Sequence, residues 1–192
     1  MKNLLIVLGV ILVICLIGGC SYNGMVTKEE TVKTKWGNVQ GQYQRRSDLI
    51  PNLVATVKGV ANFEKSTLVE VTDARARATS IQVDPTKLDP AAIQKYQAAQ
   101  GQLSSALSRL LVASERYPDL KANQNFSDLQ ASLEGTENRI AVARSDFGAA
   151  VLDYNIAIRK FPDNIFAKIF GFSEKGNFSA EADAQKAPKV SF

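Results

Sequence analysis

The side chains best suited to hold a ligand form a charged cluster in the first half of the chain. Arg45, Arg46 and Asp48 lie directly before Pro51, and Asn52 follows it. Arg46 falls on an otherwise apolar stripe with helical spacing, so its guanidinium is expected to face neighbouring helices. A guanidinium is planar and suits bidentate recognition of a carboxylate or an anionic head group. One interpretation is therefore a basic pocket for a lipid head group or a partner's carboxylate.

The other interpretation of Arg46 is a structural ion pair. A carboxylate such as Glu134 or Glu137, in the second half of the chain, would fix the register of two helices at little net gain in stability. The sequence leaves both interpretations open. The full set of candidates, for partner binding or for structural pairing, is Arg45, Arg46, Asp48, Asn52, Glu64, Glu137, Asn138, Arg139 and Arg144.

Enzymatic chemistry is not expected. Glu64 also falls on the stripe, but a structural pair with Arg139 or Arg144 is the preferred interpretation. Acid–base catalysis would need two carboxylates whose environments separate their pKa values, and no nucleophile accompanies Glu64. The 192 residues include no histidine, which removes the commonest general base and metal ligand. No catalytic residue, metal or cofactor is expected.

The composition fits one domain with extensions. Hydrophobic residues make up 45% of the chain, and 23 Lys and Arg against 19 Asp and Glu give a net charge of +4. This excess falls short of a nucleic-acid groove, so no nucleic-acid partner is expected. Both cysteines, Cys15 and Cys20, lie in or against the N-terminal apolar run, so the part of the chain after Cys20 cannot form a disulfide.

The first twenty residues have the three regions of a secretory signal. Lys2 precedes an apolar run from Leu4 to Gly19, and Ile17-Gly18-Gly19-Cys20 resembles a bacterial lipobox. We predict that Cys20 carries lipid after cleavage, with the bundle outside the cytoplasm. The alternative is an uncleaved single-pass helix with a cytoplasmic bundle, because lysines follow the run. A membrane-spanning helix requires about 20 apolar residues, and the run is shorter than that.

Apolar residues at spacings of three and four predict helices after the anchor. A first stripe runs from Val32 to Val71 and predicts one long helix to about Thr79. Proline lacks a backbone donor and crowds the preceding turn, so Pro51 predicts a kink or a one-turn break around residues 48–51. Two helices that share one stripe are the alternative.

Two further long helices complete the expected bundle. One begins with Asp89 as N-cap and Pro90 at the first helical position, and it ends before Tyr117-Pro118. The other is capped by Asn125 and measures roughly 50 Å at 1.5 Å per residue. Its apolar seam comprises Phe126, Leu129, Leu133, Thr136, Ile140, Ala143, Phe147, Ala150, Tyr154, Ala157 and Phe161. The fold class is therefore all-α, an elongated antiparallel up-and-down helical bundle with a long kinked first helix.

The C-terminal part is expected to contain a short helix, capped by Asp163 or Asn164, and a tail. The helix has an apolar face of Ile165, Phe166, Ile169 and Phe170. This face either closes one end of the bundle, the preferred interpretation, or lies on the membrane surface. Residues 173–192 predict a flexible tail. Its last residues, Val190 and Phe192, are either a C-terminal ligand motif for a PDZ-like domain or part of a frayed terminus.

The chain resembles the LemA family in two blocks. The first is QRRSDLIPNLV at 44–54 with VKG at 57–59, and the second is GTENRIAVAR at 135–144 with DYN at 153–155 and FP at 161–162. The resemblance implies an antiparallel helical bundle on a bacterial membrane, with no established catalytic activity or cofactor. Some relatives are encoded near membrane metalloproteases or small membrane proteins.

The sequence thus predicts three regions: a signal peptide or membrane anchor at 1–19, a LemA-like helical bundle at 20–172 and a tail at 173–192. The expected function is a membrane-anchored scaffold or partner-binding protein of the bacterial envelope, without catalytic chemistry. Its expected partners are the membrane, through an N-terminal lipid or helix, and an unknown envelope protein or peptide. The alternative is a regulator or accessory subunit of a membrane protease or other envelope enzyme. The oligomeric state stays open.

Overall fold

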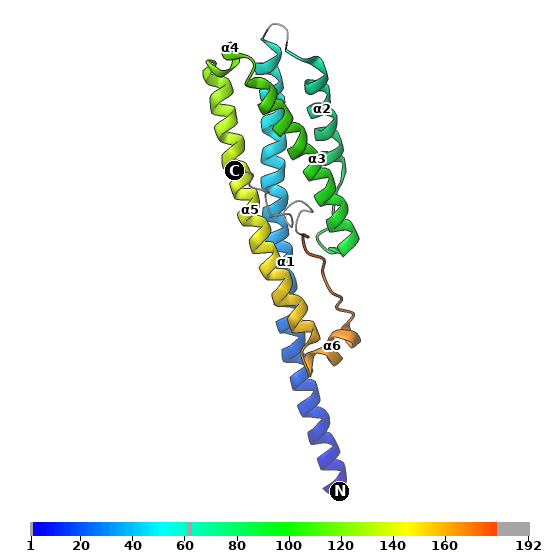
Figure 1. Ribbon diagram of the computed structural model, residues 1–192. Coiled ribbons are helices and arrows are strands. Elements are labelled where there is room, and N and C mark those ends of the chain that lie inside the picture. The colour runs from blue at the N-terminus through cyan, green and yellow to red at the C-terminus, as the bar shows by residue number, and fades with distance from the viewer. Residues whose placement is uncertain (1, 61–62, 180–192) are drawn as a thin grey trace, which may run out of the picture.

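The described residues form six α-helices in an elongated fold (Figure 1). The computed structural model describes residues 2–60 and 63–179. The helices are α1 (Lys2–Lys58), α2 (Lys65–Ser80), α3 (Pro90–Ser114), α4 (Pro118–Lys121), α5 (Gln124–Arg159) and α6 (Asp163–Phe170). Within these described ranges there is no strand, and the all-α prediction is confirmed.

The long helices α1 and α5 lie side by side, and α2 packs mainly on α3 (Figure 1). Their apolar stripes meet in two buried clusters. The first surrounds Trp36, whose ring is fully buried with centroids 5.2 Å from Tyr96 and 5.3 Å from Phe147. The second surrounds Ile50 and Leu53. A helix with one continuous apolar stripe can serve both clusters, because residues three and four apart share a face.

Helix α1 runs through Pro51 without a break, so a break at this proline was a wrong prediction. Proline removes the N–H that would bond the carbonyl of Ser47, four residues earlier. Arg75 replaces that donor from α2, since its Nε lies 2.8 Å from the Ser47 carbonyl oxygen. The helical stretch expected to reach Thr79 instead ends at Lys58 and resumes with α2. Two helices therefore occupy this stretch, as in the alternative, but they separate after Pro51 and α2 packs mainly on α3.

The sequence predicted the N-terminal caps of the helices only in part. Asp89 caps α3 as predicted, because its side chain accepts a hydrogen bond from the backbone three residues later. Helix α5 is capped by Asn123, whose side chain accepts at 3.3 Å, so the assignment of the cap to Asn125 was wrong. Neither Asp163 nor Asn164 caps α6, which follows Pro162 with no side-chain cap bond.

Helix α6 covers part of the bundle with one of its faces. It packs against both α1 and α5, with Phe166 half-buried and Ala167 3% exposed. Its other face is open, with Ile165 50% and Ile169 68% exposed. Phe161, expected to end the seam of α5, is 81% exposed. Closure of the bundle end, the preferred interpretation, therefore accounts for only the inner face of this helix.

An extended segment after α6, residues 173–179, packs on the bundle; we call it the C-terminal strap. The backbone N–H of Gly176 donates to the Leu88 carbonyl at 2.7 Å. The ring of Phe178 has its centroid 6.1 Å from that of Trp36. The sequence predicted a flexible tail from residue 173, whereas Phe178 of this segment packs against the core around Trp36, and Lys175 and Gly176 are buried. Residues 180–192 lie outside the described part of the chain.

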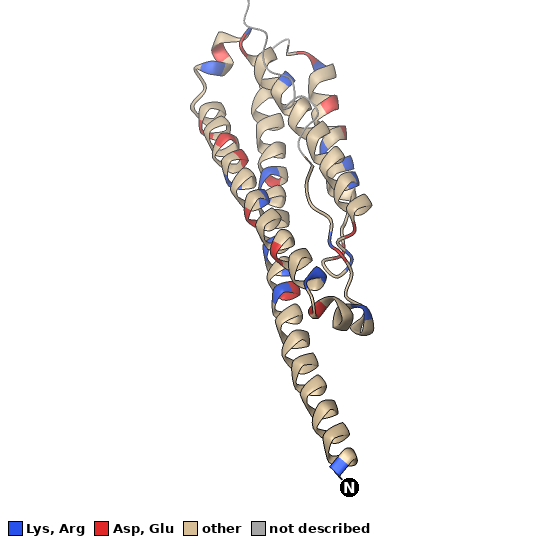
Figure 2. Ribbon diagram, turned by 60° about the horizontal axis from the view of Figure 1, so that its bottom comes forward, with Lys and Arg blue, Asp and Glu red and all other residues tan. Residues whose placement is uncertain are grey.

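The N-terminal part of α1 stands apart from the bundle (Figure 1). Large apolar side chains from Leu4 to Ile17 are between 43% and 68% exposed. This stretch carries no charged residue, and Figure 2 shows it uncoloured between Lys2 and the bundle. By length and composition α1 is the one helix among the described residues that could cross a membrane. The stretch is compatible with membrane association.

Candidate functional site

Arg46 lies in a polar layer between the two apolar clusters, formed with Gln100, Ser104 and Glu137. Arg46 is 1% exposed. Nη1 donates to Glu137 Oε1 and to Ser104 Oγ, both at 2.7 Å. Nη2 donates to the side-chain oxygen of Gln100 at 2.6 Å and to its backbone carbonyl at 3.2 Å. A buried guanidinium needs such partners, because an unpaired charge in the interior is strongly destabilising. The layer connects α1, α3 and α5.

The ion pair of this layer is asymmetric. Arg46 is buried, whereas the side chain of Glu137 is 46% exposed and reaches the edge of the bundle. The ring of Tyr43 lies 4.9 Å from the guanidinium carbon, in the range of a cation–π contact. Burial raises the pKa of the Tyr43 hydroxyl above its ordinary value. The carboxylate that the sequence left as Glu134 or Glu137 is therefore Glu137, and both Nη atoms of Arg46 are engaged inside the protein.

The remaining arginines do not pair as the sequence suggested. Glu64 accepts from Arg116 Nη2 at 2.9 Å, at the surface, so its expected pairing with Arg139 or Arg144 was wrong. The helix boundary near residue 60 explains the difference, because Glu64 is no longer on the stripe of α1 but precedes α2. Arg144 instead lies with its guanidinium carbon 4.7 Å from the ring centroid of Phe178, in the C-terminal strap.

The other candidates lie on the surface around the polar layer. Arg45 and Asn52 are exposed on α1. Asp48 accepts from Gln44 Nε2 at 2.7 Å, one turn away. Asn138 lies on α5 and lines a shallow hollow of about 390 Å³ between α1 and α5. The structure thus brings Arg46 and Glu137 together and leaves Arg45, Asp48 and Asn52 at the surface of α1. Arg139 lies beside Asn138 on α5 and donates to Thr136 at 3.3 Å.

A cavity of about 520 Å³ opens beside the polar layer. It lies between α1, the end of α2, the segment 81–85 and α3. Amide side chains dominate its polar lining: Gln40, Gln44, Gln82 and Gln100. Burial raises the pKa of the lining residue Tyr96, so its hydroxyl stays protonated and can donate. Amides and hydroxyls donate and accept hydrogen bonds without carrying charge. Asp84 adds one carboxylate to the lining, and its pKa is lowered by hydrogen bonds from Thr86. Such a lining suits a group rich in hydrogen-bond donors, for example the backbone N–H groups of a peptide.

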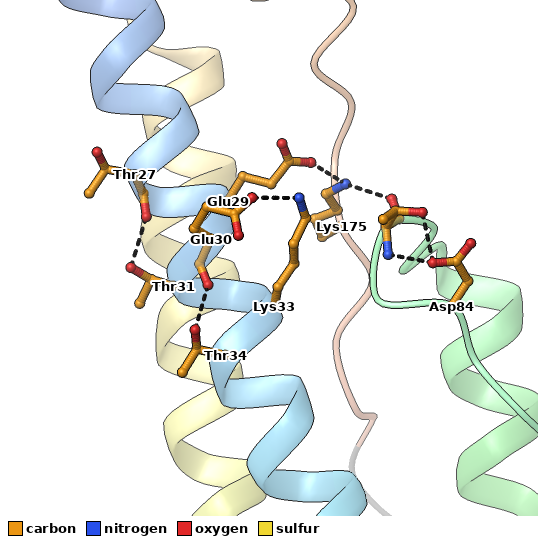
Figure 3. A network of polar contacts seen from close by, with 9 residues as sticks. Thr27, Glu29, Glu30, Thr31, Lys33, Thr34, Asp84 and Lys175 are labelled. Atoms are coloured by element: carbon orange, nitrogen blue, oxygen red, sulfur yellow. Dashed lines mark hydrogen bonds and ion pairs between the residues drawn. The ribbon is translucent and has the colours of Figure 1, made fainter.

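The structure adds a buried ion pair that sequence reasoning missed. Lys175 in the C-terminal strap is 8% exposed and places Nζ 2.7 Å from Glu29 Oε1 on α1 and 3.2 Å from the Thr86 carbonyl (Figure 3). A lysine in a Gly- and Ser-rich segment gave no periodic signal that could have found it. Val190 and Phe192, the expected ligand motif, lie outside the described residues. No cluster of three or more potential metal ligands occurs in the described part of the chain.

Comparison with known proteins finds relatives that are similar in sequence. Two magnetosome proteins of Paramagnetospirillum magneticum, MamQ 1 and MamQ 2, are each 30% identical to the chain, over 88% of it and 68% of the relative. Protein LemA of Metamycoplasma hominis is 26% identical over 75% of the chain and 59% of its own length. Residues 35–192 match the LemA family, which covers the bundle, the polar layer and the strap. The chain belongs to the LemA family.

Proposed function

We propose that the protein is a membrane-anchored scaffold that holds a rigid helical bundle at the bilayer and binds an envelope protein or peptide, without chemistry of its own. The junction of anchor and bundle on one helix carries the proposal. Helix α1 is apolar and exposed from Leu4 to Ile17 and then supplies a buried face of the bundle from Val32 to Val57. Either a retained stretch of residues 4–17 or a lipid on Cys20 is therefore attached to a core helix of the bundle.

The anchor itself is proposed to be a lipid on Cys20, which is exposed on α1. The contact of Ser21 with Asp163 and the packing of Tyr22 on Phe170, at 5.0 Å, both survive cleavage before Cys20. The intact mass of the protein from its native membrane, with Cys20→Ala beside it, tests this step. A cleaved and acylated Cys20 supports a bundle outside the cytoplasm. An uncleaved Met1 form would replace the lipid by a membrane-spanning helix.

The proposed binding site is the cavity beside the polar layer. Arg46 is not expected to touch the partner, because both its Nη atoms already donate to Gln100, Ser104 and Glu137. It instead holds α1 and α3 at the distance that keeps the cavity open. The amide groups of Gln40 and Gln44 are one helical turn apart at its edge. Their Nε2 atoms donate inside the protein, to the Val83 carbonyl at 3.4 Å and to Asp48 Oδ1 at 2.7 Å. Their side-chain oxygens can accept from the backbone N–H groups of an extended peptide.

Site-specific photo-crosslinking in the native membrane tests the binding proposal. A photoreactive residue at Gln44 should give a defined adduct. Gln124 is a matched control, because it is also exposed and also donates to an aspartate four residues later, at 2.8 Å, but lies at the start of α5, outside the cavity. Equal adducts at Gln44 and Gln124, or none at Gln44, would reject the cavity as the site. A membrane protease as the captured protein would favour the accessory role over a general scaffold.

A further inference from the structure

The outer face of α6 is an apolar surface without a protein partner among the described residues. Ile165 and Ile169 are one turn apart and are 50% and 68% exposed, with Phe170 at 47%. Phe161, four residues before Ile165, is 81% exposed. Single exposed apolar residues are ordinary on soluble surfaces, but three large apolar side chains on one eight-residue helix, with exposed Phe161 two residues before it, mark an interaction surface. The opposite face of α6 already packs on α1 and α5, so the helix has two distinct apolar sides.

This surface sits where the anchor leaves the bilayer. Phe166 lies so close to Gly18 that a Cβ on that glycine would be 2.9 Å from its ring. Asp163 contacts Ser21, and Phe170 packs edge-on against Tyr22 at 5.0 Å. Helix α6 is therefore held beside residues 18–22 of α1, directly after the exposed apolar stretch (Figure 1).

The thickness of a bilayer places residues 18–22 and α6 at the membrane–water interface for either kind of anchor. At about 1.5 Å per residue, the stretch from Leu4 to Ile17 covers about 20 Å of a hydrocarbon core of about 30 Å. If the helix is retained, the core reaches a few residues beyond Ile17, to the level of α6. If Cys20 is acylated, its chains enter the bilayer next to Ser21, and α6 is again at the surface.

We propose that α6 is a second membrane contact, in which Phe161, Ile165, Ile169 and Phe170 insert into the interfacial zone of the bilayer. The proposal rests on the membrane anchoring of the proposed function. Short amphipathic helices bury their apolar face at the boundary of head groups and acyl chains. The charges of α6, Asp163 and Lys168, cancel, so insertion depends on the apolar side chains and not on anionic lipid. Two contacts at one level would fix the tilt of the bundle over the membrane.

Tryptophan quenching in proteoliposomes tests the insertion. The full chain carrying Ile169→Trp is reconstituted into phosphatidylcholine vesicles with and without brominated acyl chains, which quench tryptophan on contact. The buried native Trp36 gives a constant background that the unsubstituted chain measures. Val112→Trp is the matched control, because Val112 is 71% exposed near the end of α3 that adjoins α4, at the far end of the bundle (Figure 1).

We expect the added fluorescence of Ile169→Trp to be lost in brominated vesicles and that of Val112→Trp to persist. Phe161→Trp is a second probe of the same face, and circular dichroism verifies that each variant is folded. Flotation of the unsubstituted chain with the vesicles reports anchoring separately. If the chain floats but Ile169→Trp and Phe161→Trp are quenched no more than Val112→Trp, the inference is overturned and the anchor is not affected. A protein found to cover this face would have the same consequence. Chains that do not float would overturn both proposals.

Discussion

Replacing Arg46 by methionine tests whether the polar layer is a structural clamp. Methionine keeps much of the length of the side chain but removes the charge and the four hydrogen bonds that both Nη atoms make. The oxygens of Gln100 and Ser104 then lose a buried donor. Removing one partner of a buried ion pair costs about 3–5 kcal/mol. Because Glu137 is 46% exposed and can turn towards water, we expect a loss near the lower end, about 3 kcal/mol.

Urea unfolding of the full chain in detergent measures this loss. Trp36 is the single tryptophan and is fully buried, so its fluorescence follows the core. Arg45→Met is the control: Arg45 precedes Arg46 on α1 but is exposed, so we expect a change of at most about 0.5 kcal/mol. An Arg46→Met chain as stable as the unsubstituted one would refute the clamp. If that stable chain, with a photoreactive residue at position 44, also gave no adduct, we would infer that Arg46 contacts the partner.

Three other substitutions probe the packing of the bundle. Arg75→Met removes the donor that serves the carbonyl left open by Pro51, so we expect urea unfolding to show a loss of about 1–2 kcal/mol. The loss should shrink in a Pro51→Ala background, where a backbone N–H returns, and equal losses would contradict this account. Gly176→Ala places a Cβ 2.6 Å from a backbone atom of α3, so the strap should detach and become a protease site; Gly101→Ala, whose Cβ meets open space, should leave the digestion pattern unchanged. Burial raises the pKa of Tyr154 to about 12 from an ordinary value of about 10. The native state therefore keeps this proton longer than the unfolded state, so stability falls as the pH rises from about 10 to 12. Tyr154→Phe should flatten that fall in the urea midpoint, and an unchanged slope would argue against a buried Tyr154 hydroxyl.

The buried layer gives the bundle a physical reason for a unique register. Apolar stripes on long helices can slide by a turn and still bury similar area, because their spacing repeats. Arg46 finds Glu137 and Gln100 at one offset only, and a displaced guanidinium would be buried without partners. Such layers add little net stability, but shifted arrangements become costly. A fixed register in turn keeps the cavity at Gln40 and Gln44 in one shape.

The sequence by itself determined the all-α class, the two long helices α3 and α5 and the apolar N-terminal run. Periodic apolar spacing located α3 and α5 closely, since a helix that buries one face must repeat at 3.6 residues. The Asp89-Pro90 start was also local, because an N-cap needs only its own side chain and the next turn. The position of Arg46 on an apolar stripe suggested either a basic pocket or an ion pair with Glu134 or Glu137, and the structure shows the pair with Glu137. The exposed apolar run at the N-terminus likewise depends on composition alone.

Only the tertiary structure decided the features that depend on residues far apart in the chain. A proline normally disrupts a helix, and α1 continues because Arg75 on another helix supplies the missing donor. The strap is ordered because Lys175 meets Glu29 across 146 positions of sequence, a contact that no local pattern encodes. The exposed face of α6 beside Gly18 likewise required the end of the chain to be placed against its beginning. Local spacing fixes which face of a helix is apolar, but only packing shows what covers that face.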